Sequence, residues 1–347
     1  MSEVTVLMTV FNGMPYLEQA VDSILHQTMS DFEFVIVDDG STDQTPEYLK
    51  SIQDPRVRII RQDNGGTAAA ANHGLENVTT QFVARMDADD ISLPTRLAKQ
   101  LEFMKQNPDV GVLGTQIVPV GSDSHGGSLA LPLTHEELFP AMMQCKHGLA
   151  HSSVMIDADR LKSIGGYWSL RLIDDWDMML RMGEISRLAN LEEVLVHYRV
   201  HSGSLNGTSM LRMHRSIAYA ADRAKRRQSN QTPISYEQFV QALDNAPFFQ
   251  RCAENLHVLA LAQYRLAIAD RCGGRKFSGT CRLAFAALCS PKRTVQRLGR
   301  MLRSRSGSTK SVSDSQATTV AQDKSSSQDF GDARAESEPK AKTGSLS

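Results

Sequence analysis

Residues 32–43, FEFVIVDDGSTD, hold the pattern that predicts the fold of this chain. Four consecutive apolar residues, Phe34 to Val37, are typical of a strand that is buried on both faces of a sheet. The run ends in Asp38 and Asp39, and a turn glycine and the helix-capping types Ser, Thr and Asp follow. The stretch predicts a buried strand, a turn that carries two carboxylates, and a helix capped by one of residues 41–43.

Four more apolar runs lie around this stretch, and helical patterns separate them. We expect strands at residues 4–10, 34–37, 57–60, 82–86 and 110–118. Amphipathic or alanine-rich patterns predict helices around residues 17–25, after residue 43, at 67–77 and around 97–104. This alternation predicts an α/β fold with a doubly wound, mostly parallel, Rossmann-like sheet that has helices on both faces.

Two of the expected strands end in acidic residues, Asp38-Asp39 and Asp87-Ala88-Asp89. Ligands of such sheets bind beyond the carboxyl ends of the strands, so we expect both acidic groups in one crevice. In an extended turn the carboxylates of Asp87 and Asp89 point the same way, and two like charges side by side need a cation or a shared proton. The spacing favours Mg²⁺ or Mn²⁺ held between these carboxylates and substrate phosphates.

The remaining pattern favours a nucleotide as the ligand. We expect one carboxylate of Asp38-Asp39 to cap the next helix and the other to accept hydrogen bonds from a nucleobase or a ribose. The chain has no G-x-x-x-x-G-K-[ST] loop, and its first strand is not followed by G-x-G-x-x-G. The lack of these phosphate loops argues against an NTPase or an NAD enzyme.

Composition excludes other classes of protein. The 347 residues include 38 Lys+Arg and 39 Asp+Glu, so we expect no nucleic-acid partner. The 5 cysteines form no C-x-x-C pair, which favours free thiols in a reducing, cytoplasmic compartment. We expect no signal peptide, and no apolar run approaches the ~20 residues of a membrane helix.

The sequence changes character towards its end. A helical pattern covers Met210 to about Arg303, and its last part, residues 271–305, is a basic amphipathic segment. From Ser304 onward Ser, Gln, Asp and Lys dominate, which is typical of disorder. We therefore expect an α/β domain at residues 1–205, a helical extension at 206–303 and a disordered tail at 304–347.

Four motifs, in this order, resemble those of family 2 glycosyltransferases with a GT-A fold. They read VLMTVFNG at 6–13, FEFVIVDDGSTD at 32–43, NGG at 64–66 and ARMDADD at 84–90. The resemblance runs from about Val4 to Ser204. It implies metal-assisted, inverting transfer of a hexosyl unit from a nucleotide-diphosphate sugar, expected to be a UDP-sugar. The acceptor would be a hydroxyl on a glycan or lipid-linked saccharide, as in bacterial polysaccharide and cell-envelope biosynthesis.

The resemblance also implies roles for residues on the donor side. Thr9 would line the nucleotide pocket, and Asp39 would pair with a uracil-type base. Asp87 and Asp89 would place the Mn²⁺ or Mg²⁺ and the diphosphate. Arg85 would help to hold the diphosphate, although an arginine on a strand is equally suited to pair with a neighbouring acid. Many relatives carry an arginine after Asn-Gly-Gly, whereas residues 68–72 here read AAAAN.

On the acceptor side, residues 173–181, IDDWDMMLR, are similar to the E-D-x-D segment of the family. Asp175 matches the catalytic base, and we expect the helix N-terminus to keep it ionised. Asp174 stands where the family has Glu, and a capping role is the alternative for Asp174 and Asp177. Residues 165–167, Gly-Gly-Tyr, resemble a loop that lines the sugar site.

Two histidines complete the set that the resemblance implies. Residues 197–204, HYRVHSGS, resemble the closing Y-R-x-H segment of the family. Within it, His201 would be a third metal ligand or a phosphate contact. His151 is similar to a position near the acceptor cleft.

Two other functions stay open from the sequence. A nucleotidyltransferase also uses an α/β sheet with metal-binding acids, but residues 9–13, TVFNG, do not form the Gly-rich basic loop that it needs. A non-catalytic protein that binds sugar nucleotides or glycans on the same fold is consistent with Asp174 and with the missing arginine.

The basic segment 271–305 also has two interpretations. It rests on an anionic membrane near a lipid-linked acceptor, which would make the protein peripheral on the cytoplasmic face. Alternatively, it is a helical cap that packs on the α/β domain.

Overall fold

The computed structural model describes residues 2–121, 130–168, 173–200 and 207–290. Its strands are β1 Val4–Val10, β2 Glu33–Asp38, β3 Val57–Arg61, β4 Phe82–Asp87, β5 Ile91–Ser92, β6 Val110–Val120, β7 Met155–Asp157 and β8 Arg187–Arg199. The helices of the first half are α1 Leu17–Leu25, α2 Thr45–Ser51, α3 Thr67–Glu76 and α4 Arg96–Gln106. Those of the second half are α5 His135–Met143, η1 His151–Ser153, α6 Ala158–Ser163, α7 Asp174–Ile185, α8 Gly207–Gln228, α9 Tyr236–Asp244, α10 Phe248–Cys272 and α11 Lys276–Cys289.

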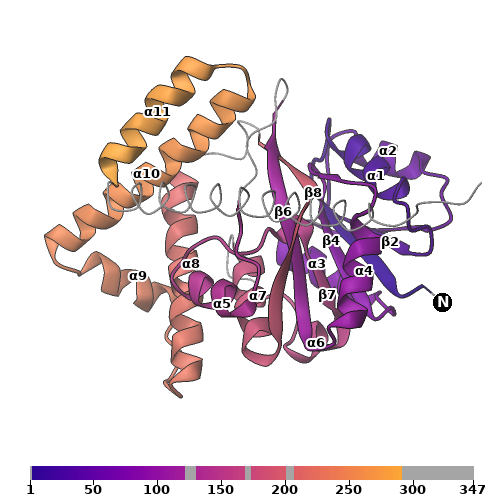
Figure 1. Ribbon diagram of the computed structural model, residues 1–347, viewed down its shortest axis with the longest axis horizontal. Coiled ribbons are helices and arrows are strands. Elements are labelled where there is room, and N and C mark those ends of the chain that lie inside the picture. Colours follow the sequence, from indigo (N-terminus) through magenta and orange to yellow (C-terminus); the bar gives the residue numbers. More distant parts are fainter. Residues whose placement is uncertain (1, 122–129, 169–172, 201–206, 291–347) are drawn as a thin grey trace, which may run out of the picture. The chain divides into compact units, whose positions relative to one another are not determined.

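The described strands form an 8-stranded mixed sheet in the order β3-β2-β1-β4-β7-β6-β8-β5 (Figure 1). The pairs β3-β2, β2-β1, β1-β4 and β6-β8 are parallel, and β7 and β5 run antiparallel to their neighbours. The predicted α/β fold with a mostly parallel sheet is confirmed. The fifth predicted strand, β6, does not lie next to β4, because the short strand β7 lies between them. Its 3 residues are too few for a periodic pattern to reveal.

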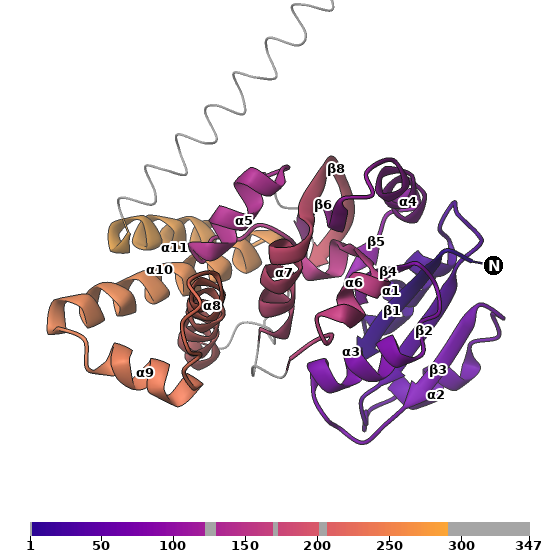
Figure 2. The ribbon, with the colours of Figure 1, turned by 90° about the horizontal axis from the view of Figure 1, so that it is seen from below.

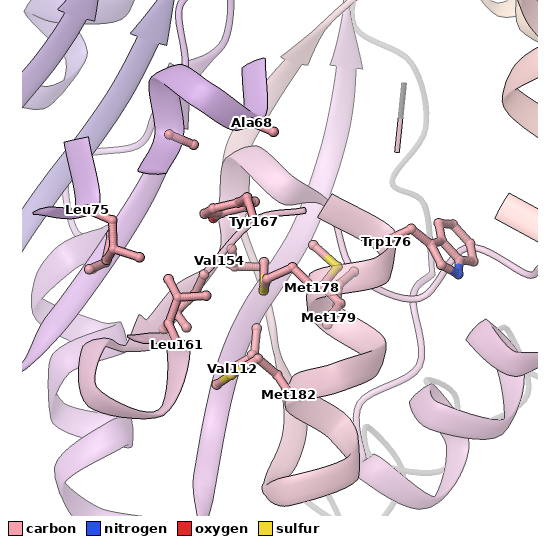
Figure 3. Packing of buried hydrophobic residues seen from close by; sticks show 14 of the residues in the cluster. Ala68, Leu75, Val112, Val154, Leu161, Tyr167, Trp176, Met178, Met179 and Met182 are labelled. Carbon is pink, nitrogen blue, oxygen red and sulfur yellow. The ribbon is translucent and has the colours of Figure 1, made fainter. Parts of the chain in front are cut away.

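Side chains of the sheet alternate between two cores, one on each face. Val4, Val6, Met8 and Val10 pack with buried residues of α1, α2 and α4. Leu7 packs in the other direction, with residues of α3, α5 and α7. Figure 3 shows part of this second core, where the methionines of α7 lie close to Val112 and Leu161. The central strands are therefore buried on both faces, as their continuous apolar runs predict.

The turns after β1 and β2 are tied to each other. Ser41 Oγ accepts a hydrogen bond from the Asn12 amide at 2.9 Å, and Asn12 Oδ1 accepts one from the Thr42 amide at 2.8 Å. Helix α2 begins after Gln44, which makes no side-chain cap. The prediction that Ser41 or Thr42 caps this helix is therefore wrong, because the neighbouring turn uses these groups. Asp43 does accept a hydrogen bond from the Thr45 amide, at 3.0 Å.

The C-terminal helical extension is confirmed as far as the structure describes it. Helices α8–α11 lie on the side of the sheet away from β2 and β3 in both ribbon views (Figures 1 and 2). None of the described helices is long and apolar enough to cross a bilayer. Residues 291–303 of the extension and the predicted tail at 304–347 lie outside the described residues.

Leu7 tests the packing of the central strand. It is fully buried, and β1 lies between β2 and β4. We expect Leu7→Ala to lower the free energy of unfolding by about 2–5 kcal/mol, through lost burial and the cavity left behind. The matched control Ile59→Ala, on edge strand β3 with 40% exposure, should change it by less than ~1 kcal/mol. Chemical denaturation measures both, and equal losses would contradict this account of the core.

Candidate active site

The two acidic motifs lie at the same edge of the sheet. Asp87 is the last residue of β4, and the register pairs it with Thr9 of β1. On the other side of β1, Val10 pairs with Asp38 of β2, directly before Asp39. Parallel strands end at one edge, so Thr9, Asp39 and Asp87 lie around the end of β1. This is the arrangement that the sequence predicts.

The Asn-Gly-Gly motif holds the carboxylate of Asp39. Oδ1 accepts hydrogen bonds from the Gln62 side chain and the Gly65 amide, both at 2.8 Å, and Oδ2 accepts one from the Gly66 amide at 2.9 Å. Gly66 has a φ of 86°, which favours glycine there. These three donors leave further lone pairs on the carboxylate, so Asp39 is fixed in direction and still able to accept a hydrogen bond.

Asp38 serves the structure of the turn. Its Oδ1 accepts the Ser41 amide at 2.9 Å, and its Oδ2 forms an ion pair with Arg61 Nη1 at 2.5 Å. The prediction that one acid of the pair caps the next helix is wrong, because α2 begins after Gln44, which no side chain caps. The structure gives Asp38 the supporting contacts.

Arg85 is buried beneath the edge of the sheet, with 2% of its surface exposed. Nη1 donates to the Leu7 carbonyl at 2.8 Å, and Nη2 lies 3.4 Å from Thr9 Oγ1 and 3.8 Å from Asp87 Oδ1. The guanidinium therefore joins β1 to β4 and forms an ion pair with Asp87. This is the second of the two roles that the sequence allows for Arg85.

His151 stands beside this pair, although sequence reasoning places it only near the acceptor cleft. Its Nε2 lies 3.3 Å from Arg85 Nε, which is always a donor. Nε2 is therefore unprotonated, and the ring proton is on Nδ1, which lies 3.8 Å from Asp87 Oδ1. Burial and the charge of Arg85 hold the pKa of His151 well below its usual range, so the ring is neutral. No spacing in the sequence links residue 151 to residue 87.

The electrostatics of Asp87 suit a divalent cation. Partial burial raises its pKa to about 6, and the charges of Asp89 and Asp174 add to the rise against the attraction of Arg85. Carboxylates that repel one another are the hard oxygen ligands that Mg²⁺ and Mn²⁺ accept, together with substrate phosphates. No group of three or more His, Cys, Asp or Glu side chains suited to a metal occurs among the described residues, and His201 lies outside them. The described part thus offers two carboxylates, which fits an ion that a substrate diphosphate also binds.

Asp90 and Arg199 hold the acidic loop in place, and no role for either residue is predicted from the sequence. Asp90 is fully buried, and its Oδ1 accepts the Arg199 amide at 2.8 Å. Arg199 Nε donates to the carbonyl of Asp89 at 2.7 Å, and its guanidinium lies 4.5 Å from the ring centre of Tyr16. The end of β8 is thereby fixed to the D-x-D loop. Asp90 belongs to the ARMDADD motif at 84–90 and Arg199 to the HYRVHSGS segment at 197–204, and this membership is the signal in the sequence that points to them.

Asp174 and Asp175 begin helix α7, close enough to Asp87 for their charges to interact. Asp174 Oδ2 accepts a hydrogen bond from Thr67 Oγ1, at the start of α3, at 2.9 Å. Asp175 Oδ1 accepts one from the Trp176 amide at 2.7 Å. Burial raises the pKa of Asp175 to about 7, and the charges of Asp174 and Asp87 contribute. The expectation that the helix terminus keeps Asp175 ionised is therefore wrong, because burial and two other carboxylates outweigh the amide.

Asp177, in contrast, is an interior ion pair. It is fully buried, and its Oδ2 accepts Arg181 Nε at 2.7 Å. Arg181 also donates to the carbonyls of Ile164 and Gly166, both at 2.7 Å. The pair thus fixes the loop at residues 164–167 that is predicted to line the sugar site.

Asn72 holds the same loop from the opposite side, at the end of the arginine-free stretch 68–72. Its Oδ1 accepts the Tyr167 amide at 2.8 Å, and its Nδ2 donates to the Tyr167 carbonyl at 2.7 Å. Tyr167 is buried, and its hydroxyl lies 3.3 Å from His151 Nε2. The loop therefore connects α3 to the histidine beside Asp87.

The family description "Glycosyl transferase family 2" matches residues 5–150, from β1 to the start of η1. The glycosyltransferase AmsE of amylovoran biosynthesis, from Erwinia amylovora, is 33% identical over 199 residues, which are 55% of this chain and 73% of AmsE. The O-antigen biosynthesis glycosyltransferase WbnJ from Escherichia coli is 31% identical over 215 residues, 60% of this chain and 83% of WbnJ. The chain belongs to glycosyltransferase family 2.

A solved structure supports the fold of this family 2 chain. Residues 1–349 of S. aureus TarS, in complex with UDP-GlcNAc, superpose with a TM-score of 0.53. The identity is 14%, and the match covers 85% of this chain and 92% of that one. At this identity the match shows the fold alone, which is GT-A.

A substitution at Asp177 tests whether this acid of α7 stabilises the fold and does not take part in the reaction. Asp177→Ala leaves the buried Arg181 without its carboxylate, and we expect the free energy of unfolding to fall by about 3–5 kcal/mol. The exposed Glu192→Ala on β8 is the control and should cost less than ~1 kcal/mol. Denaturant unfolding measures both. A loss of activity at Asp177→Ala without a loss of stability would contradict the structural role.

Proposed function

We propose that this family 2 glycosyltransferase moves a hexosyl unit from a nucleotide-diphosphate sugar to an acceptor hydroxyl, with inversion at the anomeric carbon. The observation that carries the proposal is that Asp87 lies near the acids of α7. Besides burial, the charge of Asp174 raises the pKa of Asp87, and the charges of Asp174 and Asp87 raise that of Asp175. Acids from two separate motifs of the family therefore face one small volume. A donor diphosphate and an acceptor hydroxyl would lie on the two sides of these acids.

The donor side would consist of Thr9, Asp39 and Arg85. Asp39, oriented by Gly65 and Gly66, would accept a hydrogen bond from the base of the nucleotide. A uracil has an N–H suited to this, and the TarS neighbour is known in complex with UDP-GlcNAc. Arg85 Nη2 lies between Thr9 and Asp87, so its charge would act on the diphosphate from beneath the loop. These contacts support a UDP-sugar as the donor.

Asp87 and Asp89 would hold a Mn²⁺ or Mg²⁺ ion, and His201 is proposed as a third ligand or a phosphate contact. Such an ion supplies positive charge to the diphosphate as it leaves. Arg199 donates a hydrogen bond to the carbonyl of Asp89, so it would help to hold this proposed ligand in place.

Asp175 would be the general base. In the proposed step a bond forms between the acceptor oxygen and C1, the bond from C1 to the diphosphate oxygen breaks, and the hydroxyl proton moves to the Asp175 carboxylate. Attack opposite to the leaving group inverts C1, as base and leaving group lie on opposite faces in inverting glycosidases. A base with a pKa near the working pH both exists in its ionised form and accepts a proton effectively.

The names of two relatives support the proposed acceptor class. AmsE and WbnJ act in amylovoran and O-antigen biosynthesis. We propose a glycan or lipid-linked saccharide acceptor, a catalytic unit within residues 1–205, and a place of action in the cytoplasm or at the inner face of the membrane.

Asp175→Asn tests the base. We expect turnover, measured as donor-dependent release of nucleoside diphosphate, to fall about 10²–10⁴-fold. Asp159→Asn, an exposed acid of α6, should keep wild-type turnover. The free energy of unfolding of Asp175→Asn at pH 8 should match or exceed that of the wild type. The reason is that a carboxyl whose pKa is raised from 3.8 to about 7 loses native-state stability as the pH rises between these values. Unchanged turnover would remove Asp175 from the mechanism.

The pH dependence gives a second test of the same residue. Only the ionised carboxylate accepts a proton, so kcat/KM should rise with pH and level off above about 7. The measurement is the initial rate across pH at low donor concentration. A rate that is flat between pH 5 and pH 8 would contradict the raised pKa or the role of the base.

Removal of the metal tests Asp87 and Asp89. EDTA should abolish nucleoside diphosphate release, and added Mn²⁺ or Mg²⁺ should restore it. Asp89→Ala should need more metal for half-maximal rate, whereas Asp159→Ala should not. Undiminished release in EDTA would contradict the proposed metal requirement but not the proposed transferase activity. Donor binding without release across a broad panel of donors and acceptors would instead favour the non-catalytic alternative.

A further inference from the structure

Helix α11 presents an apolar face that none of the described elements covers. Phe277, Cys281, Phe285 and Leu288 follow one another at intervals of four, four and three residues, which places them on one side of the helix. Phe277 is 84% exposed, Leu288 79% and Phe285 46%, and Cys281 is also exposed. Large apolar side chains grouped in this way on a surface are typical of an interaction site.

The opposite side of α11 packs on α10, so the orientation of the exposed face is fixed. A Cβ added to the buried Gly279 would lie 2.9 Å from the Ala267 carbonyl, which shows how closely the helices approach. Asp270 of α10 accepts hydrogen bonds from Ser278, Arg275 and Arg282 at 2.6–3.0 Å, and these hydrogen bonds, the one from Ser278 above all, lower its pKa to about 2. Two cations of the predicted basic segment are therefore used inside the hairpin.

The sequence around this face carries positive charge alone. Between Asp270 and Asp314 there is no Asp or Glu, whereas 11 Lys and Arg occur there. Exposed Lys276 lies next to Phe277. A second copy of this surface, or the chain from 291 to 313, would bring more positive charge to it. An apolar face within a cationic segment complements a surface that is apolar inside and negatively charged at its rim, which describes a bilayer with anionic headgroups.

We propose that the face formed by Phe277, Cys281, Phe285 and Leu288, called here the α11 face, docks on an anionic lipid bilayer. The phenyl and leucyl side chains would enter the headgroup region, and exposed Lys276 beside Phe277 would bind an anionic headgroup. The proposal deepens the proposed function, because it rests on a membrane-bound, lipid-linked acceptor for its biological use.

Co-sedimentation of the full chain with vesicles tests the α11 face. We expect the wild type to bind vesicles that contain phosphatidylglycerol at low salt, and to bind poorly to pure phosphatidylcholine or at high salt. The double variant Phe277→Ser, Leu288→Ser should lose about tenfold or more of its affinity for the anionic vesicles. Ile59→Ser, which removes an exposed apolar residue of β3, is the matched control and should bind as the wild type does.

A second variant reports on insertion directly. The tryptophan of Phe277→Trp should shift its fluorescence emission to shorter wavelength with anionic vesicles, and brominated lipid should quench it. No binding of the wild type at low salt would overturn the proposal. It would also be overturned if the double variant changed only the oligomeric state in light scattering, since the face would then join copies of the chain.

Turnover separates this inference from the proposed function. Without vesicles and with a soluble acceptor, the double variant should release nucleoside diphosphate at the wild-type rate. Normal turnover without vesicle binding would overturn the lipid surface alone. Vesicle binding by a chain that shows no turnover would contradict the proposed function, but it would support the α11 face as a lipid-binding site.

Discussion

The repulsion between carboxylates at the end of β1 and β4 is the constraint on which the site depends. Burial raises the pKa of both Asp87 and Asp175; the charges of Asp174 and Asp87 add to the rise for Asp175, and those of Asp89 and Asp174 add to it for Asp87. The positive charges of two buried arginines oppose the rise in the pKa of Asp87. Arg85 forms an ion pair with Asp87 from below, and Arg96 lies deeper, with its pKa lowered to about 10 by burial. Acids in such surroundings cost stability, and a sequence that keeps four of them together retains them for binding or chemistry.

Much of the surrounding structure serves to hold these acids against one another. Arg199 binds the carbonyl of Asp89 and, through its amide, the buried Asp90. Arg181 and Asn72 fix the loop that carries Tyr167, whose hydroxyl reaches His151 beside Asp87. A neutral histidine adds no charge there, and its Nδ1 proton faces the carboxylate. The acids are therefore oriented before any ligand arrives, and pre-organisation of this kind is what charge stabilisation in a transition state requires.

The sequence predicts what is local and misses what depends on distant contacts. The apolar runs locate five strands to within a few residues, and the acids at their ends follow from the parallel topology. Strand β7 has 3 residues and no detectable period, so its place between β4 and β6 was not predictable. His151 is brought to Asp87 by β7, which follows it, and no spacing encodes that contact. The pKa of Asp175 was predicted in the wrong direction because a helix N-terminus is visible in a sequence, whereas burial near Asp87 is not.

The helical extension contacts the strand pair β6-β8, which holds the acidic loop. At the end of β6, Val120 pairs with Arg199 of β8, the residue that holds Asp89. Cys272, at the end of α10, packs against this same strand end. A Cβ on Gly121 would lie 2.7 Å from the Cys272 carbonyl, and Cys272 Sγ lies 3.9 Å from the Pro119 carbonyl. The hairpin that carries the α11 face is thus packed on the end of β6, which pairs with the strand whose Arg199 holds the D-x-D loop. The β6-β8 pair therefore connects two regions by continuous packing. One is the hairpin whose α11 face is proposed to dock on a bilayer, and the other is the acidic loop where the donor is proposed to bind.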